Sequence, residues 1–227
     1  MNGPVADATP REVVIRANGD DLAGNLAVPA GAKGIVLFAH GSGSSRQSPR
    51  NVWVARHLQR AGLATLLFDL LTRAEEARDA STREHRFDIP LLAHRLAAAT
   101  LWLAEHGELA RLAVGYFGAS TGSAAALVAA AELGDRVAAV VSRGGRPDLA
   151  GEPVLARVVA PTLLIVGGND DAVLTLNRAA HAQMSCERQL AIVPGASHLF
   201  EEPGALEVVA DLAMQWFVRF LPATQGR

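Results

Sequence analysis

Short, wholly apolar runs alternate along the chain with longer segments in which apolar and polar positions repeat with helical spacing. The apolar runs after residue 33 read GIVLFAHG, LATLLFD, RLAVGYFG, RVAAVVS, PTLLIVGG and RQLAIVPG. Each is too short for a helix and ends in Gly, Asp or Ser. Runs of this kind are typical of strands buried on both faces of a parallel sheet.

The segments between these runs have recognisable helix ends. Predicted helices span residues 48–62, 88–107, 122–133 and 204–220. Capping residues and prolines mark several of their starts, and glycines mark several of their ends. The alternation predicts an α/β fold with a mostly parallel central sheet and helices on both faces. In such folds the chemistry lies at the carboxyl ends of the strands.

The chain begins differently, with two strand-like runs in residues 13–28 around the pair Asn18-Gly19, which favours a tight hairpin turn. We therefore expect an antiparallel N-terminal hairpin before the parallel sheet. At 227 residues the chain has a suitable length for a single domain, 1–227. We expect residues 1–10 and 222–227 to be flexible.

The stretch GYFGASTGSAAAL holds a serine between two glycines, where a predicted strand meets an alanine-rich predicted helix. Residues 118–122 match the pattern G-x-S-x-G, which places a serine side chain above the sheet on a sharp turn. The helix start beneath it supplies N–H groups and a positive dipole end. Ser120 is the candidate nucleophile, although on this pattern alone it could equally be a helix cap.

A serine nucleophile needs a histidine base and a carboxylate that orients the histidine. Asp170 follows the apolar run TLLIV, and His198 lies in the loop after LAIV, which gives the chain order Ser, Asp, His of the α/β-hydrolases. Asp171 and Asp148 are the rival acids. The six other histidines include one, His40, that follows a strand, and the rest lie in predicted helices or in a charged loop.

The run FAHGSGSSR provides a second set of backbone donors. Its His40-Gly41 pair resembles the loop that completes an oxyanion hole, so we predict Ser42 N–H and Thr121 N–H as the two donors. His40 is expected to anchor this loop, and it also belongs to the candidate substrate-binding residues.

The same loop permits a competing interpretation as a dinucleotide-binding turn. Gly41-x-Gly43 follows a strand and precedes a helix, and Asp69 ends the next strand. However, Arg46 occupies the position of the third glycine, and this interpretation leaves the Ser, Asp and His placement unexplained.

Substrate-binding candidates come from arginines in loops expected to converge near Ser120. Arg46, Arg143 and Arg146 are candidates for binding a carboxylate, against the alternative of ordinary salt bridges. Residues 144–161 are too few for a helical lid domain, and residues 70–89 are rich in charge. These features predict an open, small site that prefers short acyl esters.

Composition narrows the classes of partner. A formal net charge of −2 argues against nucleic acid, and the N-terminus lacks a signal peptide, so we expect a cytoplasmic protein with no membrane contact. The single cysteine, Cys186, cannot form an internal disulfide. The predicted chemistry needs no metal or organic cofactor. Nothing in the sequence indicates the oligomeric state.

These motifs together resemble the dienelactone hydrolase-like branch of the α/β-hydrolases. The matching stretches are FAHGSGSSRQSPRN, LLFDLLT, RFDIPLLAHRL, GYFGASTGSAAAL, VSRGGRPDLAG, GGNDDAVLTLNR and PGASHLFEEPGAL. The resemblance implies hydrolysis of an ester or related acyl compound by a triad of Ser120, Asp170 and His198. Members of the family are sometimes joined to a phosphoribosyltransferase domain, so the question arises whether this chain is half of a longer protein.

One departure from the family pattern concerns the nucleophile. Dienelactone hydrolases proper carry a cysteine at the position of Ser120, which puts dienelactone in doubt as the substrate. The sequence therefore predicts a serine carboxylesterase acting on a small-molecule ester. The alternatives are an acyltransferase that uses the same triad and a non-catalytic module that has kept the fold.

Overall fold

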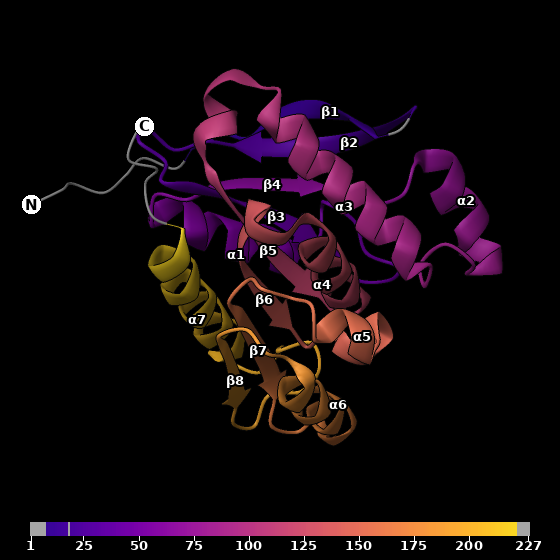
Figure 1. Ribbon diagram of the computed structural model, residues 1–227, viewed down its shortest axis with the longest axis vertical. Helices are drawn as coiled ribbons and strands as arrows, with labels where there is room; N and C mark the ends of the chain where they lie inside the picture. Colours follow the sequence, from indigo (N-terminus) through magenta and orange to yellow (C-terminus); the bar gives the residue numbers. More distant parts are fainter. Residues whose placement is uncertain (1–7, 18, 222–227) are drawn as a thin grey trace, which may run out of the picture.

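The computed structural model describes residues 8–17 and 19–221 (Figure 1). Asn18 of the expected hairpin turn and most of the ends expected to be flexible lie outside the described residues. The strands are β1 (Arg11–Ala17), β2 (Asp20–Ala27), β3 (Gly34–Ala39), β4 (Ala64–Phe68), β5 (Ala113–Ala119), β6 (Val137–Arg143), β7 (Thr162–Gly167) and β8 (Arg188–Val193). The α-helices are α1 (Pro49–Arg60), α2 (Arg73–Thr82), α3 (Ile89–Ala104), α4 (Thr121–Leu133), α5 (Glu152–Leu155), α6 (Asp171–Gln183) and α7 (Ala205–Phe220).

All these strands form one sheet in the order β1-β2-β4-β3-β5-β6-β7-β8. The N-terminal pair is antiparallel, and β2 is antiparallel to β4, whereas β4, β3, β5, β6, β7 and β8 run parallel. The predicted fold class, with its antiparallel hairpin and parallel sheet, is confirmed. From β3 the chain places β4 on one side and β5 on the other, so the strand order changes direction between β3 and β5. The loops that follow β3 and β5 therefore lie side by side at the carboxyl ends of the strands.

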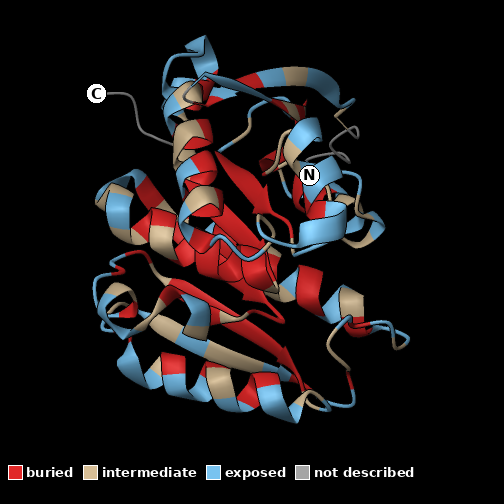
Figure 2. Cartoon of the chain, turned by 90° about the vertical axis from the view of Figure 1, so that its right-hand side faces the viewer, coloured by how far each residue is buried: buried red, intermediate tan, exposed pale blue. Residues whose placement is uncertain are grey.

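Helices cover both faces of the sheet, and the buried residues form two main clusters (Figure 2). One cluster packs side chains of α3, α4 and α6 on one face, and the other packs α1 and α7 on the opposite face. Helix α4 is the most deeply buried, because its alanines allow the helix to lie close to the sheet. This packing fixes the N-terminal end of α4 above the centre of the sheet.

Helix α2 stands apart from these layers and differs from them in chemistry (Figure 1). Only Asp79 of its ten residues is buried. A capping box starts the helix, with Thr72 Oγ1 accepting from Glu75 N–H and the Glu75 carboxylate accepting from Thr72 N–H. Arg95 of α3, whose side chain is 4% exposed, forms ion pairs with Glu75 and with Asp20 of β2. Charged contacts therefore link α2 to the body of the protein.

The segment between β6 and β7 contains only a short 3-10 helix at Pro147–Ala150 and the four-residue helix α5. The expected absence of a large lid domain is therefore confirmed for this segment. Within residues 8–17 and 19–221, no helix has both the length and the apolar character needed to cross a membrane.

Candidate active site

Ser120 occupies the turn between β5 and α4, at the N-terminal end of the helix. Its backbone has φ 50° and ψ −121°, a conformation that residues other than glycine rarely adopt. Strain of this kind persists only where the surrounding structure enforces it. Ser120 N–H donates to Arg143 O at 3.2 Å, and Ser120 O accepts from Arg146 N–H at 3.1 Å. The turn is thus held by the chain that follows β6.

The two glycines of the motif allow the backbone to approach closely on both sides of this turn. A Cβ atom at Gly122 would lie 2.1 Å from Ala39 O, and one at Gly118 would lie 2.5 Å from Ser123 Cα. Such distances are far below van der Waals contact, so any side chain there would push α4 away from the ends of β3 and β5. The G-x-S-x-G pattern therefore has a steric cause in this fold.

Asp170 and His198 meet at the neighbouring strand ends. Asp170 directly precedes α6 after β7, and His198 lies in the loop that follows β8. His198 Nδ1 is 2.7 Å from Asp170 Oδ2, and their side chains are 38% and 14% exposed. If Nδ1 carries the proton and donates it to the carboxylate, Nε2 is left as a free base. The structure thus brings together two of the three residues predicted to form the triad.

Ser120 and His198 both lie close to residues 143 and 144. Ser120 is bonded to the Arg143 carbonyl, as described above. A Cβ at Gly144 would lie 3.0 Å from His198 O and 3.6 Å from His198 Cε1. The hydrogen bonds found in the described part of the chain do not include one between the Ser120 hydroxyl and His198. Contacts of this kind often tighten only when substrate binds.

The rival acids have other surroundings. Arg146 binds Asp148 through two hydrogen bonds, Nε to Oδ1 at 2.8 Å and Nη2 to Oδ2 at 2.7 Å. Asp171 is the first residue of α6, where its carboxylate lies at the positive end of the helix. The structure places neither carboxylate against His198.

The loop after β3 reaches the start of α4. Ser42 N–H donates to Thr121 Oγ1 at 2.8 Å, so the two residues predicted to supply oxyanion donors lie in contact. That the Thr121 hydroxyl accepts from Ser42 N–H could not be predicted from the sequence. A hydroxyl group can accept from Ser42 and still donate its own proton.

The His40 side chain holds this loop through contacts of both ring nitrogens. Leu70 N–H donates to His40 Nε2 at 3.0 Å, which leaves the ring proton on Nδ1, where Gly41 O is 3.0 Å away. Burial lowers the pKa of His40, so the neutral form is favoured. Both ring nitrogens are therefore engaged within the protein.

The three arginines predicted near the site have different environments. Arg46 forms an ion pair with Asp69 and also donates its backbone N–H to the same carboxylate. That carboxylate is therefore already occupied, whereas a dinucleotide ribose would need it free. Arg146 is paired with Asp148, as described above. Arg143 is buried, and its Nε and Nη1 find no hydrogen-bond partner among residues 8–17 and 19–221.

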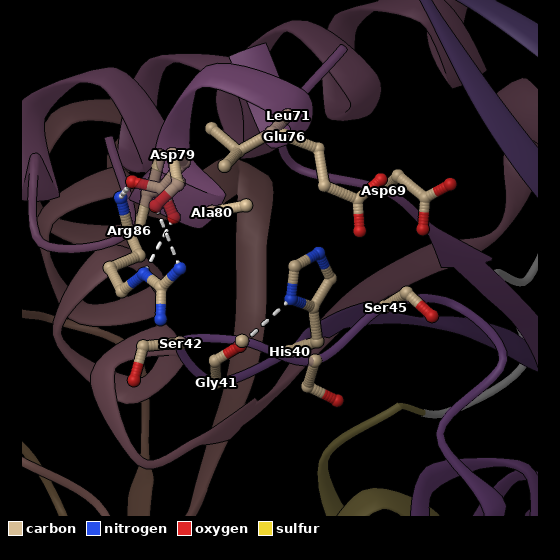
Figure 3. Close-up of a pocket in the computed structure, with 13 residues that line it drawn as sticks. His40, Gly41, Ser42, Ser45, Asp69, Leu71, Glu76, Asp79, Ala80 and Arg86 are labelled. Carbon is tan, nitrogen blue, oxygen red and sulfur yellow. Dashed lines mark hydrogen bonds and ion pairs between the residues drawn. The ribbon is translucent and has the colours of Figure 1, made fainter. Parts of the chain in front are cut away.

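A cavity of about 220 Å³ adjoins the loop after β3 (Figure 3). One wall comes from this loop, and the other comes from α2 and the residues beside it. The second wall lies within residues 70–89, the charge-rich stretch of the sequence, although the lack of apolar periodicity there gave no indication of a helix. The lining residues are His40, Gly41, Ser42, Gly43, Ser44, Ser45, Asp69, Leu71, Glu76, Asp79, Ala80, Arg86 and Leu92.

The polar wall of this cavity is organised by Asp79 and Arg86. Arg86 Nε donates to Asp79 Oδ2 at 2.6 Å, and the backbone N–H groups of His85 and Arg86 donate to Asp79 Oδ1 (Figure 3). These contacts lower the pKa of Asp79 below its usual value, despite the opposing effect of desolvation. One wall of the cavity therefore carries charged groups, while Leu71, Ala80 and Leu92 contribute to an apolar surface that makes up the larger part of the lining.

Comparison with known proteins agrees with this fold. Residues 32–219 match the model of an alpha/beta hydrolase domain. A crystal structure of a dienelactone hydrolase from Anabaena variabilis is 59% identical, with a TM-score of 0.93 over 95% of this chain and 99% of that chain. Est1E from Butyrivibrio proteoclasticus is 16% identical with a TM-score of 0.77, over 92% of this chain and 98% of that chain, which is a likeness of fold alone.

Curated relatives extend beyond the region of similarity. Two Mycobacterium tuberculosis proteins, each named as a phosphoribosyl transferase, are 60% identical over 210 residues, which is 92% of this chain and 46% of each relative. The chain thus spans about half the length of the curated relatives it matches. The family match over most of the chain and the 59% identical structure lead to one conclusion: the chain belongs to the α/β-hydrolase family, in its dienelactone hydrolase-like branch.

Proposed function

We propose that the protein is a serine carboxylesterase that hydrolyses short-chain esters through Ser120, His198 and Asp170. The observation that carries this proposal is the 2.7 Å contact of His198 Nδ1 with Asp170 Oδ2, on loops that flank the strained Ser120 turn. A histidine oriented by a carboxylate near a half-buried serine on a strained turn is the arrangement that activates a hydroxyl group.

The reaction follows from these positions. Ser120 Oγ attacks the ester carbonyl carbon while His198 Nε2 takes the hydroxyl proton, and Asp170 stabilises the imidazolium that forms. His198 then returns the proton to the leaving alkoxide as the carbon–oxygen bond breaks, which leaves an acyl-Ser120. Water attacks this acyl group by the same route, and the acid and free Ser120 are released.

Backbone and hydroxyl donors would stabilise the negative charge on the carbonyl oxygen. Thr121 N–H is in the first turn of α4, where backbone N–H groups have no partner within the helix. Ser42 N–H, the second predicted donor, donates to Thr121 Oγ1 at 2.8 Å, which leaves the hydroxyl proton of Thr121 free to donate to the carbonyl oxygen. The dipole of α4 adds positive potential at the same place.

The size and lining of the cavity beside Ser42 support a short-chain substrate. Its volume of about 220 Å³ is below the range of about 300–1,000 Å³ usual for drug-sized ligands. Leu71, Ala80 and Leu92 supply apolar surface that suits a short acyl chain, and Asp79 and Arg86 place charged groups beside it. Small acyl groups therefore fit this cavity best.

Serine-directed labelling tests the proposal. A p-nitrophenyl phosphonate should form one covalent adduct, and peptide mapping should place it on Ser120. Ser120→Ala and His198→Ala should each remove most turnover of p-nitrophenyl butyrate, because residues that act as a unit fail together. Labelling of Ser42 or Ser123 instead would contradict the assignment. Faster product formation with an added alcohol acceptor than with water would identify an acyltransferase.

A further inference from the structure

Asn177 is a buried polar side chain in the middle of α6 that the proposed reaction does not use. It is 0% exposed, and the other buried residues of this helix are apolar: Val173, Leu174 and Ala180. Asparagine is unfavourable inside a helix, because its amide competes with the backbone for hydrogen bonds. Burial of an amide group also costs free energy unless the group finds partners. The contacts of the Asn177 amide therefore indicate why the residue is there.

The amide nitrogen of Asn177 makes two hydrogen bonds to carbonyl oxygens. Nδ2 donates to Val173 O at 2.8 Å within α6, and to Gly145 O at 2.9 Å in the loop after β6. Carbonyl oxygens only accept, so these partners require the NH2 group of the amide to face them. Oδ1 has no partner among residues 8–17 and 19–221. An amide that leaves its oxygen unpaired is a poor choice for stability alone, which points to the Gly145 contact as the reason for the residue.

Gly145 belongs to the segment that holds the nucleophile turn. On one side of it, Arg143 O accepts from Ser120 N–H at 3.2 Å, and on the other, Arg146 N–H donates to Ser120 O at 3.1 Å. The segment lies so close to the start of α4 that a Cβ at position 145 would be 2.5 Å from Ser123 Oγ. Because no side chain fits at this position, the backbone carbonyl of Gly145 is the group through which a neighbouring helix can hold the segment.

The same segment also contacts the loop of the predicted base. Gly144 N–H donates to Ile165 O of β7 at 2.8 Å, and a Cβ at Gly144 would lie 3.0 Å from His198 O. Segment 143–146 therefore adjoins both the Ser120 turn and the loop that carries His198.

Helix α6 connects the Gly145 contact with the predicted acid. Asp170 directly precedes α6, and its carbonyl accepts from Leu174 N–H at 2.8 Å in the first turn of the helix. Asn177 follows Asp170 by seven residues, about two helical turns, so both lie on the same side of α6. The hydrogen bonds within the helix fix the spacing of the two residues. A bond from Asn177 to Gly145 therefore also holds Asp170 relative to the Ser120 turn.

We infer that Asn177 is a positioning residue, which sets the distance and angle between the Asp170–His198 pair and Ser120. The inference rests on the proposed esterase function and adds a further residue on which turnover depends. Asn177 takes no part in bond making, and it acts through Gly145 and through α6. The alternative is a structural role, in which Asn177 contributes only to the stability of the fold.

Asn177→Thr removes the contact with Gly145 while it keeps a side chain of similar volume. Two threonines in helices of this protein, Thr100 and Thr175, each donate to the carbonyl oxygen four residues earlier, at 3.1 and 2.9 Å. A threonine at position 177 should bond to Val173 O in the same way. This variant therefore satisfies its own helix without reaching Gly145.

Asn177→Ala removes both hydrogen bonds, and Gln59→Ala is its matched control. Gln59 is a buried amide in α1, and its Nε2 donates to Thr65 Oγ1 at 2.7 Å near the start of β4, at the end of the sheet away from the active site. Gln59→Ala should lose stability but retain the turnover of the wild type.

The kinetic test measures hydrolysis of p-nitrophenyl butyrate per reactive serine, with the serines counted by phosphonate labelling taken to completion. Both Asn177 variants should lower kcat about ten- to hundredfold, because a displacement of about 1 Å between reacting groups can cost about 10²-fold. KM should change less than about twofold, since the cavity beside Ser42 has no wall in α6. The acidic limb of the kcat/KM profile should keep its midpoint, because the Asp170–His198 contact remains. A structural role would reduce the number of labelled serines but not the kcat of each.

Amide hydrogen exchange gives a readout that does not depend on turnover. Ser120 N–H and Arg146 N–H both bond between the nucleophile turn and the segment that Asn177 holds. In NMR measurements these two amides should exchange about tenfold faster in Asn177→Thr than in the wild type, and at the wild-type rate in Gln59→Ala.

The outcomes separate the two proposals. A kcat per labelled serine within about threefold of the wild type in Asn177→Thr, an equal loss in Gln59→Ala, or failure of both Asn177 variants to fold would assign Asn177 a structural role and overturn the inference alone. Failure of the wild type to hydrolyse any ester would contradict the esterase function, and the exchange rates of the two amides would still decide whether Asn177 holds the turn.

Discussion

The strained backbone of Ser120 predicts that removing its side chain completely will stabilise the protein more than shortening it will. At φ 50° and ψ −121° a side chain costs about 1–3 kcal/mol, and glycine avoids this cost. Against this gain stands the greater freedom of glycine in the unfolded chain, about 0.5–1 kcal/mol relative to alanine. Ser120→Gly should therefore be more stable than Ser120→Ala by about 1 kcal/mol.

Urea denaturation and thermal unfolding of the two variants measure this difference. For a protein of this size, about 1 kcal/mol corresponds to about 2–4 °C in Tm. Both variants lack the Ser120 hydroxyl, so they differ only in the methyl group at this position. Equal urea m-values would show that both variants unfold to similar states.

Ser123 provides the matched control, because it lies three residues later within α4, has helical geometry and is fully buried. There the order should reverse, with Ser123→Ala more stable than Ser123→Gly by about 1 kcal/mol. If glycine were the less stable choice at both positions, the strain attributed to the Ser120 turn would be refuted.

Three further predictions follow from the site. Asp170→Asn should lower kcat by about 10⁴-fold, whereas Asp148→Asn should lower it less than about tenfold. If steady-state kinetics gave the reverse order, the acid of the triad would be Asp148, in the loop after β6. Turnover should fall from butyryl through octanoyl to palmitoyl p-nitrophenyl esters, and fastest turnover on the palmitoyl ester would contradict a cavity of about 220 Å³ as the acyl site. Gly122→Ala should cost about 3 kcal/mol of stability in urea titration, because its Cβ would meet Ala39 O at 2.1 Å. Gly31→Ala, which has open space around it, should cost about 1 kcal/mol. Equal losses would refute the steric argument.

Sequence patterns predicted the strands and most of the helices, because these elements are specified by local apolar periodicity and by caps. Ser48 does cap α1 through Asn51 N–H, and Asp88 caps α3 through Leu91 N–H. The sequence indicated only a charge-rich stretch at α2, since a helix with one buried residue gives no apolar stripe. Its capping box, Thr72 with Glu75, was the available signal.

The arrangement of side chains around the site could be predicted only in part. Chain order and strand ends placed Asp170 and His198 in one region, because parallel strands end at a common edge. The sequence could not show which charged side chains form ion pairs, since the partners are distant in sequence or depend on loop geometry. Asp69 binds Arg46 across 23 positions, and only the structure distinguishes this arginine from the unpaired Arg143.

Helix α2 is a wall of the cavity, yet it has little of the apolar burial that holds the sheet and α4 together. Local opening free energies follow such burial, so α2 should exchange its amide hydrogens well before β5 and α4 do. The chain thus separates a rigid platform, which carries the Ser120 turn, from a weakly held segment that walls the cavity. Substitutions in α2 can then change the shape of the cavity while the platform keeps its geometry, which is a route by which one fold acquires different specificities.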